Sequence, residues 1–170
     1  MNPCIFLDRD GVINVERGTY TWVIEDFKII PGVVESLKKL KEAGFLLIVV
    51  TNQSGIGRGL FTKAEMEACH RYLMEQTGHI LDDIYFSTVH PSRSESLLRK
   101  PDSLMFEKAI ARYNIDPAIS WMVGDNERDM TPASKLGIRT IFIGLPPDSV
   151  GSMHIAKDLR QASGIILENQ

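Results

Sequence analysis

The feature that most constrains this chain is the alternation of short apolar segments with amphipathic segments of helical period. The apolar segments lack the alternating polar positions of a strand that is exposed on one face. Such segments are typical of parallel strands covered by helices on both faces. We therefore predict an α/β fold, a three-layer sandwich with a parallel sheet and right-handed crossovers. Strands are expected at residues 4–7, 45–50, 84–86, 121–123 and 140–143.

Four helices are predicted between these strands. Pro31 and Gly44 mark the ends of the first, because proline is favoured at a helix start and glycine just past a helix end. Thr62 and Glu65 have the spacing of a capping box and predict that the second helix begins there. The other two are expected at 104–113 and at about 129–136.

Length and composition favour one domain spanning residues 1–170. The formal net charge is −3 and Lys and Arg form no long run, so no nucleic-acid partner is expected. The apolar run 45–50 is far too short to cross a membrane, and the N-terminus lacks the pattern of a signal peptide. Two cysteines provide no disulfide framework. We expect a monomeric, cytoplasmic protein without membrane association.

Polar residues directly follow three of the predicted strands. Asp8 and Asp10 follow the first strand, Thr51 and Asn52 the second, and Asp125 the fourth. In an open parallel sheet, ligands bind at the edge formed by the carboxyl ends of the strands. These side chains should therefore converge in space.

The pair Asp8 and Asp10 predicts phosphoryl transfer supported by Mg²⁺. A carboxylate that attacks a phosphate must overcome like-charge repulsion, and a hard divalent cation with oxygen ligands removes that repulsion. Asp8 would form an aspartyl-phosphate, while Asp10 would protonate the leaving oxygen and later take a proton from water. Asp125 is a better candidate metal ligand than Asp129, which lies where an acidic residue stabilises a helix start.

Thr51 and Lys100 are candidates for binding the phosphoryl group. The Thr51 hydroxyl can donate a hydrogen bond to a phosphoryl oxygen, and Lys100 can supply a fixed positive charge. Each motif also has a structural interpretation: Asp-x-Asp-Gly can be a turn, Thr51 a capping residue, and Arg99-Lys100 a solvated surface pair. Their occurrence together favours the functional interpretation.

The order of four motifs, Asp8-Arg9-Asp10-Gly11, Thr51, Lys100 and Gly124-Asp125, resembles the haloacid dehalogenase superfamily of phosphohydrolases over roughly residues 5–144. The resemblance implies a Rossmann-like fold and phosphatase activity. It also implies that Asp8 is the nucleophile, Asp10 the general acid and base, and Thr51 and Lys100 phosphate ligands. Mg²⁺ would be held by Asp8, the Asp10 carbonyl and Asp125.

Within this superfamily, segments 7–14, 50–59 and 99–101 are similar to the branch of D-glycero-D-manno-heptose 1,7-bisphosphate phosphatases and histidinol-phosphate phosphatases. The Ser-Gly-x-x-Arg-Gly segment after Asn52 favours the heptose enzymes, and thus a role in making lipopolysaccharide or another surface glycan. Histidinol phosphate or a broad set of sugar phosphates is the alternative substrate. The branch has no cap domain, and the resemblance implies substrate contacts from Asn52, Gln53, Ser54, Arg58 and Arg99.

Relatives in this branch usually carry a structural zinc on a loop written Cys-x-His and then Cys-x-Cys, just before Arg-Lys-Pro. In this chain the corresponding positions hold residues that bind zinc poorly, so we expect no zinc. The loop should instead be held by hydrogen bonds or packing. The four replacing residues are Ser87, Val89, Ser96 and Leu98.

Two other functions fit parts of the sequence. Gly55-Ile56-Gly57-Arg58-Gly59 suggests nucleotide binding, but its third glycine comes one residue too early for the dinucleotide motif and the helix begins too late. A catalytically silent binding module on the same fold is the second. The intact Asp8, Asp10, Lys100 and Asp125 argue against it.

Overall fold

Six parallel strands form one sheet in the computed structural model, which describes residues 1–147 and 154–169. Their order is β3-β2-β1-β4-β5-β6, so the strand order reverses between β1 and β4. Every neighbouring pair in this sheet is parallel. The strands are β1 (Cys4–Leu7), β2 (Leu46–Asn52), β3 (Asp83–Ser87), β4 (Trp121–Gly124), β5 (Arg139–Ile143) and β6 (His154–Ala156).

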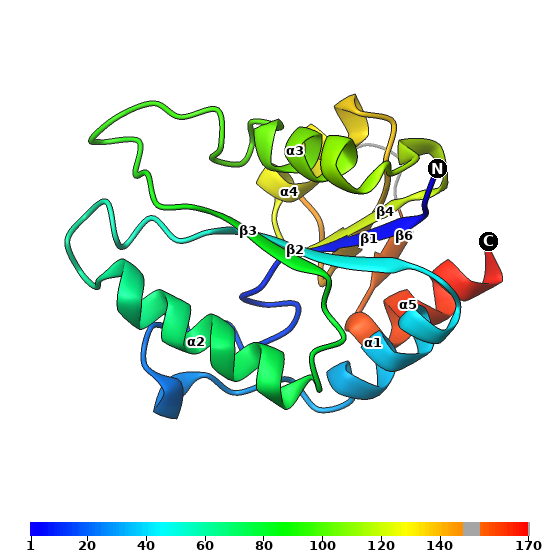
Figure 1. Cartoon of the computed structure of the whole chain (residues 1–170), viewed down its shortest axis with the longest axis horizontal. Helices are drawn as coiled ribbons and strands as arrows, with labels where there is room; N and C mark the ends of the chain where they lie inside the picture. The colour runs from blue at the N-terminus through cyan, green and yellow to red at the C-terminus, as the bar shows by residue number, and fades with distance from the viewer. Residues whose placement is uncertain (148–153, 170) are drawn as a thin grey trace.

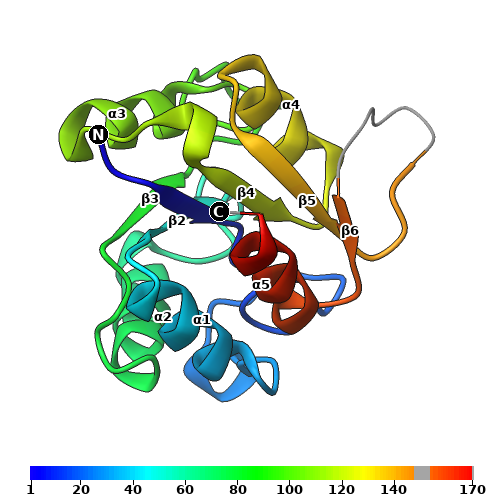
Figure 2. The same cartoon turned by 90° about the vertical axis from the view of Figure 1, so that its right-hand side faces the viewer.

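Five helices within the described residues cover this sheet from both sides (Figures 1 and 2). Helices α1, α2 and α5 lie on one face, and α3 and α4 lie on the other. The predicted three-layer α/β fold is thereby confirmed. The helices are α1 (Val33–Glu42), α2 (Lys63–Gln76), α3 (Leu104–Tyr113), α4 (Glu127–Lys135) and α5 (Leu159–Glu168), with 3-10 helices at Ile24–Asp26 and Pro117–Ile119.

Strand β1 shows why its sequence is apolar throughout. Ile5 and Leu7 are buried against the first helical layer, whereas Cys4 and Phe6 are buried against the second. Successive side chains of a strand point to opposite faces, so a strand between two helical layers needs apolar residues at every position. The next residue, Asp8, therefore emerges at the carboxyl edge of the sheet.

The four predicted helices are present, with one shifted start. Thr62 and Glu65 form the expected capping box before α2. Helix α4 begins at Glu127 instead of Asp129, because the Asn126 side chain accepts a hydrogen bond from the Arg128 N–H and acts as the N-cap.

The C-terminal segment adds two elements that were not assigned from the sequence. Strand β6 pairs with β5, and α5 packs against α1. The described C-terminal segment therefore packs on the same sheet as the rest of the chain. Residues 148–153 and 170 of the predicted domain lie outside the described residues.

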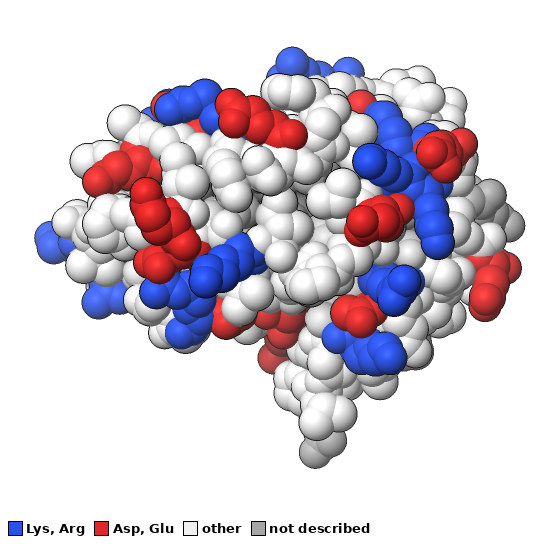
Figure 3. All heavy atoms as spheres, turned by 90° about the horizontal axis from the view of Figure 1, so that it is seen from below, with Lys and Arg blue, Asp and Glu red and all other residues white. Residues whose placement is uncertain are grey.

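The described segments before α1 and before α3 consist of loops and one 3-10 helix, so neither contains a cap domain. Within residues 1–147 and 154–169, no helix is long and apolar enough to span a membrane. On the face seen in Figure 3, acidic and basic side chains are interspersed. The carboxyl edge of the sheet is bordered by the loops before α1 and before α3.

Candidate active site

Four segments that are distant in the sequence meet at the carboxyl edge of the sheet. Asp8 follows β1, Thr51 lies near the end of β2, Asp125 follows β4, and Lys100 enters from the loop before α3. Strands β1 and β4 are the neighbours between which the strand order reverses. Open α/β sheets form their ligand sites at such a point. The predicted convergence of Asp8, Thr51 and Asp125 at this edge is present in the structure, and Lys100 joins them from a loop.

Lys100 is the centre of a buried ion cluster. Its Nζ lies 3.0 Å from Asp8 Oδ1, 2.7 Å from Asp129 Oδ1 and 2.7 Å from the carbonyl oxygen of Val50. The Val50 carbonyl accepts a hydrogen bond from Nζ, and the two carboxylates are its ion-pair partners. Burial alone would lower the pKa of Lys100, but Asp129 and Asp8 outweigh it and raise that pKa. Lys100 therefore stays charged in the interior.

Asp129 has a larger role than stabilising a helix start. Its Oδ2 accepts a hydrogen bond from the Asn126 N–H at 3.1 Å and completes a capping box at α4. Its other oxygen pairs with Lys100. Gly124 leaves room for this side chain, because a Cβ there would lie 2.5 Å from Asp129 Cβ. The fully buried Asp129 thus joins α4 to the ion cluster.

Asp8, Asp125 and Asp129 form an acidic cluster in which one ligand oxygen of each lies within 4.8 Å of the others. Burial and repulsion by Asp129 raise the pKa of Asp8 to about 6, and burial and repulsion by Asp8 raise the pKa of Asp125 to about 6. Gly11, at φ +82°, lets the backbone approach Asp125 where a Cβ would overlap the carboxylate. Oxygen ligands held together despite their repulsion fit a hard divalent cation.

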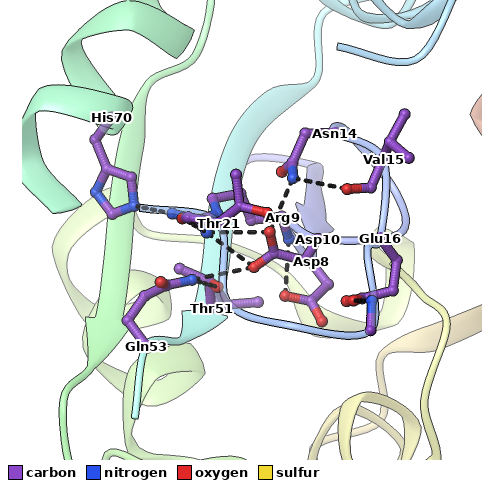
Figure 4. A network of polar contacts seen from close by, with 12 residues as sticks. Asp8, Arg9, Asp10, Asn14, Val15, Glu16, Thr21, Thr51, Gln53 and His70 are labelled. Carbon is purple, nitrogen blue, oxygen red and sulfur yellow. Dashed lines mark hydrogen bonds and ion pairs between the residues drawn. The ribbon is translucent and has the colours of Figure 1, made fainter. Parts of the chain in front are cut away.

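The Asp10 carboxylate accepts hydrogen bonds from three side chains (Figure 4). Arg9 Nη2 lies 3.0 Å from both oxygens, Asn14 Nδ2 lies 2.8 Å from Oδ1, and Gln53 Nε2 lies 3.2 Å from Oδ2. The side chain remains 24% exposed and lines the cavity described below. The resemblance assigns the Asp10 carbonyl, and not this carboxylate, to the metal.

Thr51 and Gln53 form a hydrogen-bonded pair beside these carboxylates. Gln53 Nε2 donates to Thr51 Oγ1 at 2.9 Å as well as to Asp10. The Thr51 hydroxyl accepts this bond and can still donate its own proton to a ligand. Thr51 lines the cavity, whereas Gln53 is buried behind it.

Asn52 and Ser54 tie neighbouring segments together. Asn52 Nδ2 donates to the Lys100 carbonyl at 2.9 Å, and Asn52 Oδ1 accepts from the Lys100 N–H at 3.1 Å. Ser54 Oγ lies 3.1 Å from the Tyr20 hydroxyl. Loops from three parts of the chain are thereby held around one space.

That space is a polar cavity of about 500 Å³, a volume typical of small-molecule sites. Three guanidinium groups line it together with the carboxylates: Arg58, Arg99 and Arg128. Among the described residues, none of the three has a carboxylate within 4.0 Å. Burial and repulsion by Arg128 lower the pKa of Arg99. The cavity therefore combines acidic groups with unpaired positive charge.

The loop between β3 and α3, where relatives usually carry a zinc site, is held by hydrogen bonds in this structure. His90 Nδ1 lies 2.7 Å from Ser92 Oγ, and Arg99 Nη1 donates to the Val89 carbonyl at 3.1 Å. His90 also lines the cavity. The absence of zinc remains a prediction.

Local sequence patterns did not identify every side chain around the cavity. Glu16 and Tyr20 lie in the irregular segment after β1, whose path no periodicity specifies. Arg128 lies on the first turn of α4, three residues after Asp125. Arg128 could have been identified from the sequence, because a helix was predicted to begin shortly after the strand that ends before Asp125.

Comparison with known proteins agrees with these motifs. Residues 4–137 match the haloacid dehalogenase-like hydrolase family. The chain is 41% identical over 145 residues to the D-glycero-beta-D-manno-heptose-1,7-bisphosphate 7-phosphatase of Haemophilus ducreyi, an alignment that covers 80% of this chain and 79% of that protein. It is 42% identical over 147 residues to the protein of the same name from Escherichia coli K12, with coverage of 81% and 76%.

Solved structures share the fold over nearly the whole chain. The D,D-heptose 1,7-bisphosphate phosphatase from B. bronchiseptica, crystallised with magnesium and phosphate, aligns with a TM-score of 0.88 at 26% identity and 99% coverage of both chains. The D,D-heptose 1,7-bisphosphate phosphatase from Burkholderia thailandensis aligns with a TM-score of 0.71 at 29% identity, covering 97% of this chain and 98% of that one. These similarities extend past the family match into the C-terminal segment.

The acidic cluster predicts that Mg²⁺ stabilises the protein near pH 7.5 and hardly at pH 5. The pKa values of Asp8 and Asp125, about 6, lie above their ordinary value of 3.8. Between these values the folded, metal-free protein binds more protons than the unfolded chain, so the stability from these groups is present below about pH 4 and lost as the pH rises through about 6. A bound cation would offset the repulsion between the ionised carboxylates and so restore this stability at the higher pH.

Differential scanning calorimetry measures this effect. With Mg²⁺ at about 100 times its Kd, we expect Tm to rise by roughly 5–10 °C near pH 7.5 and by less than about 2 °C at pH 5. Asp125→Asn should abolish most of the rise. An equal rise at both pH values would show that these carboxylates are not protonated in the metal-free protein.

Proposed function

We propose that this phosphatase, which belongs to the haloacid dehalogenase-like hydrolase family, removes the 7-phosphate of D-glycero-D-manno-heptose 1,7-bisphosphate. The observation that carries the proposal is the cavity, which joins the carboxylate and lysine cluster to three arginines without carboxylate partners among the described residues. The substrate named for relatives at 41% and 42% identity supports it.

Asp8 is the nucleophile in this proposal. The Arg9 N–H and Lys100 Nζ contact its Oδ1 at 2.7 and 3.0 Å and hold the carboxylate in one orientation. The carboxylate attacks the phosphorus atom, the bond from phosphorus to the sugar oxygen breaks, and an aspartyl-phosphate forms on Asp8.

Asp10 transfers the protons of both half-reactions. It first donates a proton to the departing sugar oxygen, for which a neutral alcohol is a far better leaving group than an alkoxide. It then accepts a proton from the water that attacks the phosphorus of the aspartyl-phosphate, which releases phosphate and restores Asp8. Asp10 lines the cavity in which the substrate and this water would be held.

Thr51 and Lys100 stabilise the phosphoryl oxygens in different ways. The Thr51 hydroxyl donates a hydrogen bond. Lys100 is held by ion pairs with Asp8 and Asp129 and by a hydrogen bond to the Val50 carbonyl, so it acts as a fixed positive charge near the phosphoryl group.

A divalent cation fits the acidic cluster, and we propose that it is Mg²⁺, held by Asp8, Asp125 and the Asp10 carbonyl. When bound, it would neutralise the phosphoryl charge that otherwise repels Asp8. Asp129 is already paired with Lys100, so it supports this site from behind.

The arginines favour a substrate with a second phosphate. Guanidinium groups bind phosphate in a bidentate way, and Arg58, Arg99 and Arg128 approach the cavity from three different segments. Histidinol phosphate carries an ammonium group that this cluster would repel. A simple hexose phosphate would leave the cluster unpaired.

Other parts of the proposal follow from the family and from the cavity. Asn52, Gln53 and Ser54 position or contact the substrate alongside Arg58 and Arg99. The protein acts as a cytoplasmic monomer, and its reaction belongs to the assembly of heptose for lipopolysaccharide or another surface glycan.

Asp8→Asn should lower kcat by roughly 10⁴-fold or more, because it removes the attacking charge while preserving the side-chain volume. Phosphate release measures the loss, and a thermal melt verifies the fold. Asp102→Asn, at an exposed acid two residues after Lys100, is the matched control and should retain activity. Retention of more than a tenth of the activity by Asp8→Asn would exclude the covalent mechanism.

Arg99→Met should raise KM for the bisphosphate by about 10- to 100-fold, since a charge-assisted hydrogen bond contributes about 1.5–3 kcal/mol. KM for a monophosphate such as 4-nitrophenyl phosphate should change by less than about threefold. Arg160→Met, on the exposed side of α5, is the control. Equal effects on both substrates would argue against a second phosphate at the arginines.

The substrate itself is tested by kcat/KM with Mg²⁺ on both anomers of the heptose bisphosphate, histidinol phosphate and hexose phosphates. We expect a preference of about 100-fold or more for one heptose anomer, which corresponds to about 2.7 kcal/mol of discrimination. Similar, low values on every compound would retain the phosphatase chemistry and reject the heptose assignment.

A further inference from the structure

Arg9 is a fully buried arginine next to the reacting carboxylates, and the mechanism above uses only its main-chain N–H. Its side chain has 0% exposure. Burying a guanidinium group is unfavourable unless its charge and donors are satisfied. The contacts of this group therefore show what its position achieves.

The Arg9 guanidinium connects three parts of the chain (Figure 4). Nη2 lies 3.0 Å from both oxygens of Asp10 and donates to the Thr21 carbonyl at 2.8 Å. Nη1 lies 3.3 Å from His70 Nε2 on α2. The plane is supported by Phe27, whose ring centroid is 5.3 Å from Arg9 Cζ.

His70 acts as the acceptor in its contact with Arg9. A guanidinium group can only donate hydrogen bonds, so Nε2 must present a lone pair, and the proton of the neutral ring lies on Nδ1. Burial and the charge of Arg9 lower the pKa of His70 to about 3, which agrees with a neutral ring. Helix α2 thereby fixes one end of the guanidinium fork.

Arg9 Nε is buried without a hydrogen-bond partner among the described residues. An unmade buried hydrogen bond costs about 1–3 kcal/mol. The orientation of the guanidinium group thus provides hydrogen-bond partners for Nη1 and Nη2 but none for Nε. The two satisfied ends are the ones that link Asp10 to α2.

We propose that Arg9 is a positioning residue that sets the direction of the Asp10 carboxylate, with His70 fixing Arg9 in turn. This rests on Asp10 acting as the general acid. Proton transfer needs a donor within hydrogen-bond reach of the leaving oxygen. Lysine at position 9 keeps the positive charge, but its single nitrogen cannot take the place of both Nη2, which contacts Asp10 and Thr21, and Nη1, which contacts His70.

The test uses the dependence of general acid catalysis on the leaving group. An alkyl ester, the heptose bisphosphate, needs protonation of its leaving oxygen, whereas 4-nitrophenolate departs from 4-nitrophenyl phosphate without it. The parameter is kcat/KM, which covers the steps up to the first irreversible one and so reports transfer to Asp8. Arg9→Lys should lower kcat/KM for the heptose bisphosphate (the alkyl value) about 10- to 100-fold and kcat/KM for 4-nitrophenyl phosphate (the aryl value) less than about threefold. The expected loss on the alkyl ester is smaller than or equal to a complete loss of general acid catalysis, which typically contributes 10²–10⁴-fold.

Two comparisons separate this effect from a general loss of structure. Arg139→Lys changes another arginine, whose Cζ lies 4.3 Å from the Trp121 ring centroid and which does not line the cavity; it should leave the ratio of alkyl to aryl values unchanged. In an Asp10→Asn background, Arg9→Lys should change the ratio by less than about twofold, because the group it positions is gone.

The outcomes distinguish this inference from the proposed function. If Asp10→Asn leaves the ratio unchanged, Asp10 is not the general acid and both ideas fail. If Asp10→Asn lowers the ratio and a folded Arg9→Lys does not, only the positioning role is wrong. Should Arg9→Lys fail to fold, His70 decides: His70→Leu should lower the ratio and His70→Gln, which keeps an acceptor, should restore most of it, and unchanged ratios in both would overturn the proposal.

Discussion

The site depends on one buried ammonium group. Lys100 lies between Asp8 and Asp129 and also binds the Val50 carbonyl, so it joins the segment after β1, strand β2, the loop before α3 and the start of α4. Removing Lys100 would leave the buried carboxylates of Asp8 and Asp129 without a compensating positive charge, which is strongly unfavourable. The electrostatic requirement of a single lysine thus keeps distant segments in register.

The same cluster links stability to chemistry. Lys100 compensates part of the negative charge, yet the pKa values of Asp8 and Asp125 are still raised to about 6. Burial and mutual repulsion of the carboxylates outweigh the attraction. A fold that holds these carboxylates together despite their repulsion is preorganised for a cation. The proposed chemistry needs Asp8 as a negatively charged carboxylate, and a bound cation would stabilise that charged form.

The polar side chains around this centre differ in length and therefore in the residues that they contact. Short side chains such as Thr51 act at the cavity wall, whereas Asn52 uses both side-chain groups to hold the main chain of Lys100. The long Arg9 side chain turns inward and contacts α2 through His70. The direction of Asp10 therefore also depends on a residue outside the Asp8–Gly11 turn, because His70 holds the Arg9 side chain that contacts Asp10.

The fold, and the meeting of Asp8, Thr51 and Asp125 at one sheet edge, could be predicted from local patterns of the sequence. Apolar runs predicted five strands, and the capping pair Thr62 and Glu65 marked a helix start, because periodicity and capping depend on residues close in the chain. Strand β6 was missed, since it is short and its first two residues, His154 and Ile155, are exposed.

What only the tertiary structure decided is which distant side chains meet. The pairing of Lys100 with Asp129, the contact of Arg9 with His70 across 61 positions, and the gathering of Arg58, Arg99 and Arg128 arise from strand order and loop paths. The sequence alone determined that Asp8, Thr51 and Asp125 end their strands at one sheet edge. It could not determine these partners, because a side-chain contact depends on the positions of both segments, and local patterns specify each segment by itself.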